Sequence, residues 1–163
     1  MWFYGLASAV ILLDQATKLL IQQAFRPGES LPVLPGFFSL TYVLNPGAAF
    51  GLLAGAAAAF RGPFFIGVSV LAIGMICYYH ARHVRGRALP AVGLALILGG
   101  AVGNLIDRLR VGMVIDFLDF YLGAYHWPAF NVADSGITIG VGLLLVEMLR
   151  ERRGNGREAA GAS

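Results

Sequence analysis

Residues 104–134 read NLIDRLRVGMVIDFLDFYLGAYHWPAFNVAD and contain four of the nine acidic residues of this 163-residue chain. Long apolar runs flank this stretch, LPAVGLALILGGAVG over 89–103 and ITIGVGLLLVEML over 137–149. Ionisable side chains between segments that can enter a membrane are costly to bury, and they therefore indicate a functional site. The fold must explain how the flanking segments bring these acids together.

The composition of the whole chain indicates a membrane protein. Hydrophobic residues make up 58% of the chain, charged residues make up 13%, and the mean hydropathy is +0.72, far from the values of a soluble domain. The net charge is only +3, with most arginines near predicted helix ends, so we expect no nucleic-acid partner. The single cysteine, Cys77, excludes an internal disulfide and a cysteine-based metal site.

Apolar segments of about 20 residues are long enough to span a bilayer. Four segments of this chain qualify, at about 3–24, 63–81, 88–107 and 133–150. The first lacks the basic start of a signal peptide, so we interpret it as a retained span. Small residues in the third favour close helix packing. We predict one membrane domain over 1–153, followed by a disordered cytoplasmic tail over 154–163.

The distribution of arginine predicts the orientation of these spans. The link between the second and third spans and the C-terminal tail together hold seven arginines, namely Arg82, Arg85, Arg87, Arg150, Arg152, Arg153 and Arg157. The opposite side holds four, at Arg26, Arg61, Arg108 and Arg110. Because cytoplasmic loops carry the excess of basic residues, we expect both termini in the cytoplasm and the segments 25–62 and 108–132 outside.

The two outer segments are too apolar for solvated loops. Three prolines interrupt RPGESLPVLPG at 26–36, and the aromatic and β-branched run GFFSLTYVL at 36–44 favours a short strand or hairpin. Aromatic residues in the second outer segment suit the lipid headgroup region. The predicted fold is an all-α polytopic membrane protein of four transmembrane helices, with a small β-sheet and a loop or short helix on the outer, extracytoplasmic face.

Polar residues from distant parts of the chain are expected at one depth in the membrane. A helix rises about 1.5 Å per residue, so Asp14 lies beyond the middle of the first span and Lys18 lies one turn further out on the same face. Others reach this level from the third and fourth spans and the outer loops, namely Asn104, Asp107, Arg108, Asn131, Asp134, Asn45 and Asp116. We therefore predict one polar layer near the outer interface.

Several of these residues also have a purely structural interpretation, which stays open. Asp14 and Lys18 together can form a charge pair that only lowers the cost of insertion. Asp134 can cap the fourth helix by accepting from its free N–H groups. Asp107 and Arg108 can form an interfacial ion pair.

The remaining polar positions also have structural interpretations that involve no function. The stretch NPGAAFG at 45–51 can be a simple turn, and Asp119 is expected to be a solvated loop acid. His80, His83 and His126 are expected at the surface or interface, and they lack the spacing of metal ligands on the outer face. We predict no metal site and no cofactor.

The outer layer offers carboxylate chemistry, because no Ser–His or Cys–His nucleophile pair is evident there. Two acids in one site cannot both ionise cheaply, so one stays protonated while the other acts as a base, as in an aspartyl protease. Asp116 lies between apolar Ile115 and Phe117, which disfavours its ionised form. Asp134 lies at a helix start, whose dipole favours its anion. We predict these two aspartates as the catalytic pair.

Five motifs in order resemble the bacterial lipoprotein signal peptidases, the signal peptidase II family. They read DQATK at 14–18, NPGAAF at 45–50, GGAVGNLIDR at 99–108, VIDF at 114–117 and FNVAD at 130–134. The resemblance covers nearly the whole chain. It implies an intramembrane aspartyl endopeptidase that removes signal peptides from prolipoproteins, cutting before the diacylglyceryl-modified cysteine.

The resemblance also implies the site residues. The family's catalytic aspartates fall on Asp116 and Asp134. Its other motif residues, which would bind substrate or support the site, fall on Asp14, Lys18, Asn45, Gly47, Gly99, Gly103, Asn104, Asp107, Arg108, Asn131 and Ala133. The implied partners are diacylglyceryl-prolipoproteins and membrane lipids, and the implied location is the bacterial cytoplasmic (inner) membrane. We expect a monomer.

A different function class stays open as an alternative. A small proton- or cation-coupled transporter also holds acids among glycine-rich helices. Such a transporter usually places them near the middle of the membrane and is built from two similar halves, and no internal repeat is visible here. A purely structural membrane subunit is a second alternative.

Overall fold

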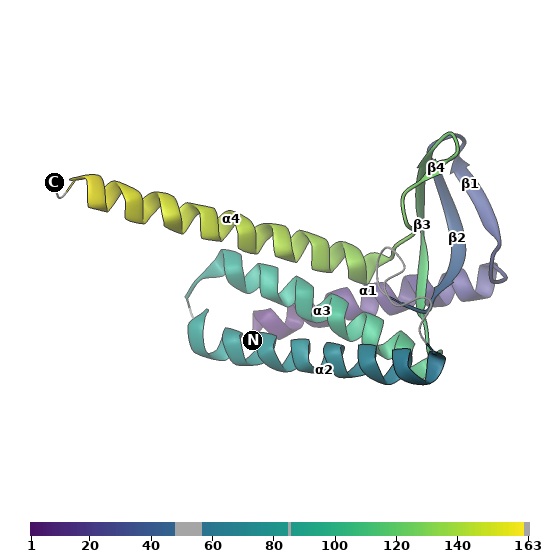
Figure 1. Cartoon of the computed structure of the whole chain (residues 1–163), viewed down its shortest axis with the longest axis horizontal. Coiled ribbons are helices and arrows are strands. Elements are labelled where there is room, and N and C mark those ends of the chain that lie inside the picture. Colours follow the sequence, from purple (N-terminus) through teal and green to yellow (C-terminus); the bar gives the residue numbers. More distant parts are fainter. Residues whose placement is uncertain (48–56, 85, 162–163) are drawn as a thin grey trace.

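The computed structural model describes residues 1–47, 57–84 and 86–161 of the chain. The helices are α1 (Trp2–Ala24), α2 (Ala58–His83), α3 (Ala88–Arg110) and α4 (Val132–Gly161). The strands are β1 (Ser30–Leu34), β2 (Phe38–Asn45), β3 (Val114–Leu122) and β4 (Tyr125–His126). All four helices contain a segment long and apolar enough to cross a membrane, which confirms the predicted fold class. Figure 1 shows the sheet at one end of the helices and both termini toward the other.

Helix boundaries differ from the predicted spans mainly at α2 and α4. Helix α2 begins at Ala58, so Pro63 lies inside the helix rather than near its start. Helix α4 continues to Gly161, although the part suited to crossing a membrane ends at Arg152. The helix therefore runs into the tail predicted to be disordered, where Arg, Glu and Ala are good helix formers.

The sheet combines both outer segments. Its strands are antiparallel in the order β1-β2-β3-β4, and β2 confirms the strand predicted within 36–44. The second outer segment was not predicted to join this sheet. It supplies β3, which is rich in the β-branched and aromatic residues that favour strands. Residues 48–56, which hold the second half of the NPGAAF motif, lie outside the described residues.

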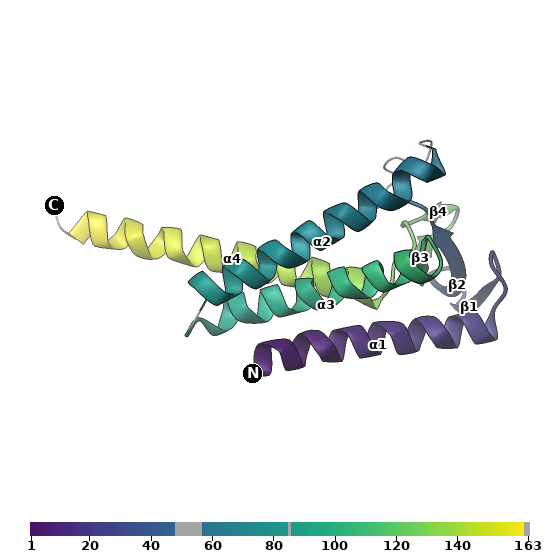
Figure 2. The same cartoon turned by 90° about the horizontal axis from the view of Figure 1, so that it is seen from below.

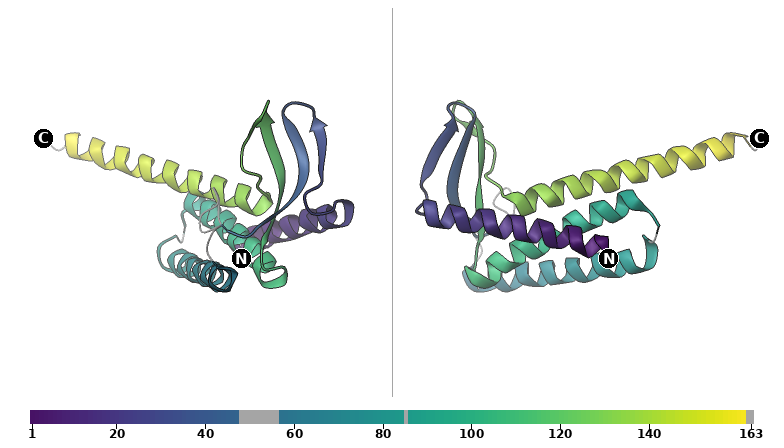
Figure 3. Two further views of the ribbon diagram at one scale, coloured as in Figure 1. Left: turned by 45° about the vertical axis from the view of Figure 1, so that its right-hand side comes forward. Right: turned by 180° about the vertical axis from the view of Figure 1, so that it is seen from behind.

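Helix α3 is the centre of the helical part. It packs against α1, α2 and α4, and Figures 2 and 3 show it among the other three helices. The close approach of α1 requires glycine at Gly103, because a Cβ there would lie 2.6 Å from Oδ2 of Asp14. This agrees with the packing predicted from the small residues of the third span.

The buried polar layer lies between two apolar clusters. One cluster, at the end away from the sheet, includes Phe3 and Ala7 of α1 and Leu98 of α3. The other, beneath the sheet, includes Ile21 of α1 and Ile115 of β3. The buried Asp14 and Lys18 lie between these clusters along α1, so the charged groups are enclosed on both sides by apolar packing.

Candidate active site

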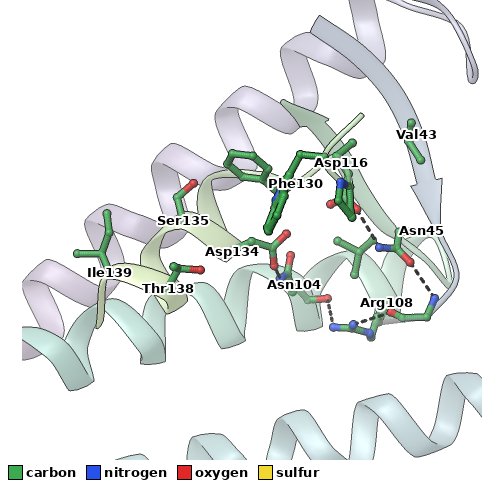
Figure 4. Close-up of a pocket in the computed structure, with 15 residues that line it drawn as sticks. Val43, Asn45, Asn104, Arg108, Asp116, Phe130, Asp134, Ser135, Thr138 and Ile139 are labelled. Atoms are coloured by element: carbon green, nitrogen blue, oxygen red, sulfur yellow. Dashed lines mark hydrogen bonds between the residues drawn. The ribbon is translucent and has the colours of Figure 1, made fainter. Parts of the chain in front are cut away.

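Asp116 and Asp134 line the same cavity, which has a volume of about 740 Å³. Figure 4 shows both side chains at the wall of this cavity, Asp116 from β3 and Asp134 from the first turn of α4. The polar part of the wall is completed by Asn45, Asn104 and Arg108. The other lining residues are largely apolar and are Val43, Gly47, Val114, Trp127, Pro128, Ala129, Phe130, Ser135, Thr138 and Ile139.

Asp116 is almost completely buried, with 2% of its surface exposed. Its Oδ1 accepts a hydrogen bond from Nδ2 of Asn131 at 2.7 Å, and its Oδ2 accepts one from Nδ2 of Asn45 at 2.9 Å. Burial, and after it the nearby charge of Asp134, raises the pKa of Asp116 to about 7, while the two asparagine donors act against this rise. Asp116 therefore keeps its proton up to about neutral pH.

Asp134 is held by a different asparagine. Its Oδ1 accepts a hydrogen bond from Nδ2 of Asn104 at 2.7 Å. The cap of α4 is Asn131, whose Oδ1 accepts from the backbone N–H of Asp134 at 2.9 Å. The interpretation of Asp134 as the capping side chain is therefore wrong, and its carboxyl group is left at the cavity wall.

Behind the cavity lies a buried charge cluster centred on Lys18, which is 1% exposed. Its Nζ lies 2.9 Å from Oδ2 of Asp14 and 2.6 Å from Oδ2 of Asp107. The same nitrogen donates to Oδ1 of Asn104 at 3.0 Å, so it has a partner for each of its three N–H bonds. The lysine thus fixes the amide that contacts Asp134.

The two carboxylates of this cluster also hold the backbone on either side of the cavity. Asp14 accepts from the N–H of Ala133 at 2.9 Å, and Asp107 accepts from the N–H of Ile115 at 3.2 Å. Ala133 directly precedes Asp134, and Ile115 directly precedes Asp116. Each carboxylate of the cluster is therefore bonded to the residue before one of the two cavity aspartates. A charge pair that only lowers the cost of membrane insertion would not make these backbone contacts.

Arg108 forms the far side of the cavity. It donates from Nη1 to the carbonyl of Asn104 and from Nη2 to the carbonyl of Gly47, both at 3.3 Å, and its guanidinium lies 5.3 Å from the ring centroid of Phe65. Asp107 pairs with Lys18 rather than with Arg108, so the interpretation of Asp107 and Arg108 as an interfacial ion pair is wrong. Oδ1 of Asn45 accepts from the N–H of Gly47 at 3.0 Å, which closes a local turn.

The structure thus brings the predicted site residues into two adjoining layers. Six line the cavity, namely Asn45, Gly47, Asn104, Arg108, Asp116 and Asp134. Five lie directly behind it, namely Asp14, Lys18, Asp107, Asn131 and Ala133.

Asp119 does not join this group. It lies on β3 with 13% of its side chain exposed and contacts Nδ1 of His126 at 2.9 Å, so its interpretation as a solvated loop acid is wrong. The pleat explains the difference, because residues at odd and even positions of a strand point to opposite faces. Asp116 and Asp119 are three residues apart and therefore face opposite sides.

Other residues of the site are absent from the prediction. Gln15 donates from Nε2 to Oδ1 of Asp107 at 3.0 Å and to the carbonyl of Gly103 at 3.2 Å. Thr138 and Ile139 line the cavity next to Asp134. The spacing of four residues between Asp134 and Thr138 along one helix is a signal that identifies Thr138 once Asp134 is known to face a cavity.

Comparison with known proteins gives consistent matches over most of the chain. The profile of the family described as Signal peptidase (SPase) II matches residues 6–150. A lipoprotein signal peptidase of Syntrophus aciditrophicus is 52% identical over 90% of this chain and 91% of its own length. One of Geobacter sulfurreducens is 53% identical over 92% and 95%. A solved structure described as a bacterial membrane enzyme has a TM-score of 0.82 at 34% identity, covering 90% of this chain and 87% of its own.

Proposed function

Since the chain belongs to the signal peptidase II family of membrane peptidases, whose substrates are prolipoproteins, we propose that it cleaves them with Asp116 and Asp134. The bond cut is the one before the diacylglyceryl-modified cysteine. The observation that carries the proposal is the shared cavity. Two carboxyl groups from separate elements line it, and an asparagine side chain holds each of them.

The two aspartates divide the work of hydrolysis. Asp116, whose pKa is raised to about 7, carries the proton and donates it to the oxygen of the scissile carbonyl. Asp134, at the positive end of a helix, is ionised and takes a proton from the attacking water, whose oxygen bonds to the carbonyl carbon. When the carbon–nitrogen bond breaks, Asp134 passes this proton to the leaving amine and Asp116 recovers its own from the intermediate.

The surrounding polar residues keep the pair in this arrangement. Asn45 and Asn131 donate to Asp116, and Asn104 donates to Asp134. Lys18 supports Asn104 from behind. Arg108 places a positive charge at the cavity wall, where it attracts the ionised carboxylate of Asp134.

The apolar remainder of the cavity suits a lipid-modified substrate. Val43, Phe130 and Ile139 contribute apolar wall on different sides of the two aspartates, where substrate acyl chains and signal-peptide side chains would exclude water. Strand β1 is exposed along its whole length, and its leucines would enter the headgroup region of the outer leaflet. The aspartates then lie near the outer interface, at the level of the modified cysteine, with both termini in the cytoplasm.

The test is cleavage in detergent of a purified diacylglyceryl-modified prolipoprotein beside the same precursor without the lipid. We expect a size shift with the modified precursor alone. Equal cleavage of both precursors would contradict the requirement for lipid. No cleavage of either by folded protein would contradict the peptidase itself and direct attention to ion-flux assays.

A further inference from the structure

A second hollow lies at the other end of the molecule from the aspartates. It is an apolar groove between α2 and α3 with a volume of about 400 Å³, lined by Met75, Ile76, Tyr78, Tyr79 and Leu94. Helix α2 packs mainly against α3, with the ring of His80 near its C-terminal end stacked on Phe3 of α1, and only 6% of the residues in its most hydrophobic stretch are buried. The groove therefore faces the surroundings of the protein.

Basic side chains stand at one end of this groove. The guanidinium of Arg82 lies 5.9 Å from the ring centroid of Tyr78, and the ring of His83 lies 5.0 Å from that of Tyr79. Both are in the last turn of α2. Tyr78 and Tyr79 of the groove wall thus contact Arg82 and His83, two side chains that can carry a positive charge.

Acidic residues do not neutralise this end of the groove. The sequence has no Asp or Glu between Glu29 and Asp107. The acids that reach this region from α4, Glu147 and Glu151, both contact Arg87. Among the described residues, Arg82 forms no ion pair with a carboxylate.

We propose that this groove binds one anionic phospholipid of the surrounding bilayer. An acyl chain lies along the apolar wall formed by Met75, Ile76 and Leu94, and the phosphate is held by Arg82 and His83 at the membrane surface. An apolar groove that ends in unneutralised basic side chains complements a lipid with an apolar tail and a negative headgroup. A zwitterionic lipid offers the same tail without the net charge.

The position of the groove suggests what the lipid does. Helix α2 is held to the bundle mainly through α3, and its other end carries Phe65, which lies against Arg108 of the candidate active site. A lipid seated between α2 and α3 adds contacts to both helices. It therefore stabilises the attachment of α2 without touching the catalytic cavity.

Native mass spectrometry of the full-length protein in detergent tests the proposal. Equal amounts of phosphatidylglycerol and phosphatidylcholine with the same acyl chains are added, and the lipids retained by the protein are identified. We expect one retained phosphatidylglycerol. Arg82→Ala lowers the preference for it by about fivefold, the usual effect of one basic residue near a lipid surface, and Met75→Trp lowers retention of both lipids by filling the groove.

Arg26→Ala is the matched control, because Arg26 is exposed at the opposite end of the molecule. It leaves the preference unchanged, and Arg82→Ala keeps the peptidase activity, which shows that the variant is folded. Equal retention of the two lipids by the unaltered protein overturns the proposal, as does an Arg82→Ala variant with unchanged preference. A dimer that forms in place of lipid binding, and that Met75→Trp dissociates, also overturns it and assigns the groove to a second copy.

Discussion

At the scale of single residues, asparagine at positions 45, 104 and 131 combines two roles that no charged side chain fills. Each amide donates to an aspartate while its oxygen accepts from another group, which is Gly47, Lys18 or the N-terminus of α4. A neutral donor positions a carboxyl group without forcing it to ionise as strongly as a lysine or arginine does. This suits a pair in which one member keeps its proton.

Replacing either cavity aspartate by asparagine is expected to abolish peptide cleavage. Asp116→Asn and Asp134→Asn each remove one of the two proposed proton-transfer groups, and such groups contribute rate factors of about 100 to 10,000. The matched control is Asp119→Asn, which changes another acid of β3 that does not line the cavity. Initial rates on the modified precursor give the comparison. Substantial activity in both cavity variants, or its loss in Asp119→Asn, would remove the pair from the mechanism.

The pH dependence of cleavage follows from the raised pKa of Asp116. Because that pKa is about 7, the carboxyl group is protonated below this pH and loses its proton above it. We therefore expect kcat/KM to fall as the pH rises through about 7. Asn45→Ala removes a donor that favours the ionised form, so the alkaline limb should move to higher pH. A limb that stays in place or moves to lower pH would contradict the proposed role of Asp116.

At the scale of elements, the site is a junction where α1 and α3 hold the starts of β3 and α4. The carboxylates of Asp14 and Asp107 bond the backbone before each cavity aspartate, and Lys18 balances their charge. A buried cluster of this kind is held in place by its complete pairing, since any unpaired member would be costly. The geometry of the two aspartates therefore depends on how three helices pack.

Removing the lysine should destabilise the protein more than removing an exposed arginine. Lys18→Met leaves two buried carboxylates without their partner, a change that costs about 3–5 kcal/mol in comparable sites. Arg87→Met breaks partly exposed pairs with Glu147 and Glu151 and should cost about 1 kcal/mol. Thermal unfolding in detergent measures both variants. Equal effects would show that the Lys18 cluster does not support the fold.

Helix contact at α3 and α4 can be tested with two glycines. A Cβ at Gly100 would meet the backbone carbonyl of Ala133 and the side chain of Ile137, whereas a Cβ at Gly142 meets nothing within 4 Å. Gly100→Ala should push α4 away beside Asp134, lowering stability by about 1–3 kcal/mol and lowering activity with it. Gly142→Ala should leave both intact. Full activity in Gly100→Ala would mean that the helices adjust without moving Asp134.

At the scale of the whole molecule, the sequence predicts the four helices, because long apolar runs are unambiguous. It also predicts that most polar residues of the site lie at one depth in the membrane, because the rise per residue of a helix gives the depth of each position. The contacts that complete the site and the sheet depend instead on which distant residues pair in the folded protein. Asp107 binds Lys18 rather than its neighbour Arg108, and β3 becomes a strand by pairing with β2. Gln15 acts between α1 and α3, a contact that no local pattern in either helix records.

The orientation of the molecule in the membrane is the last prediction, and it rests on the arginine excess at the end away from the sheet. Cysteines introduced singly at Ala124 and Arg152 in a Cys77→Ala background report the two ends, because both positions are exposed. A maleimide that cannot cross the membrane should label Ala124→Cys on spheroplasts, since Ala124 lies between β3 and β4. It should label Arg152→Cys only after the membrane is opened. The reverse pattern would place the aspartates near the cytoplasmic surface, where a substrate modified on the outer face could not reach them.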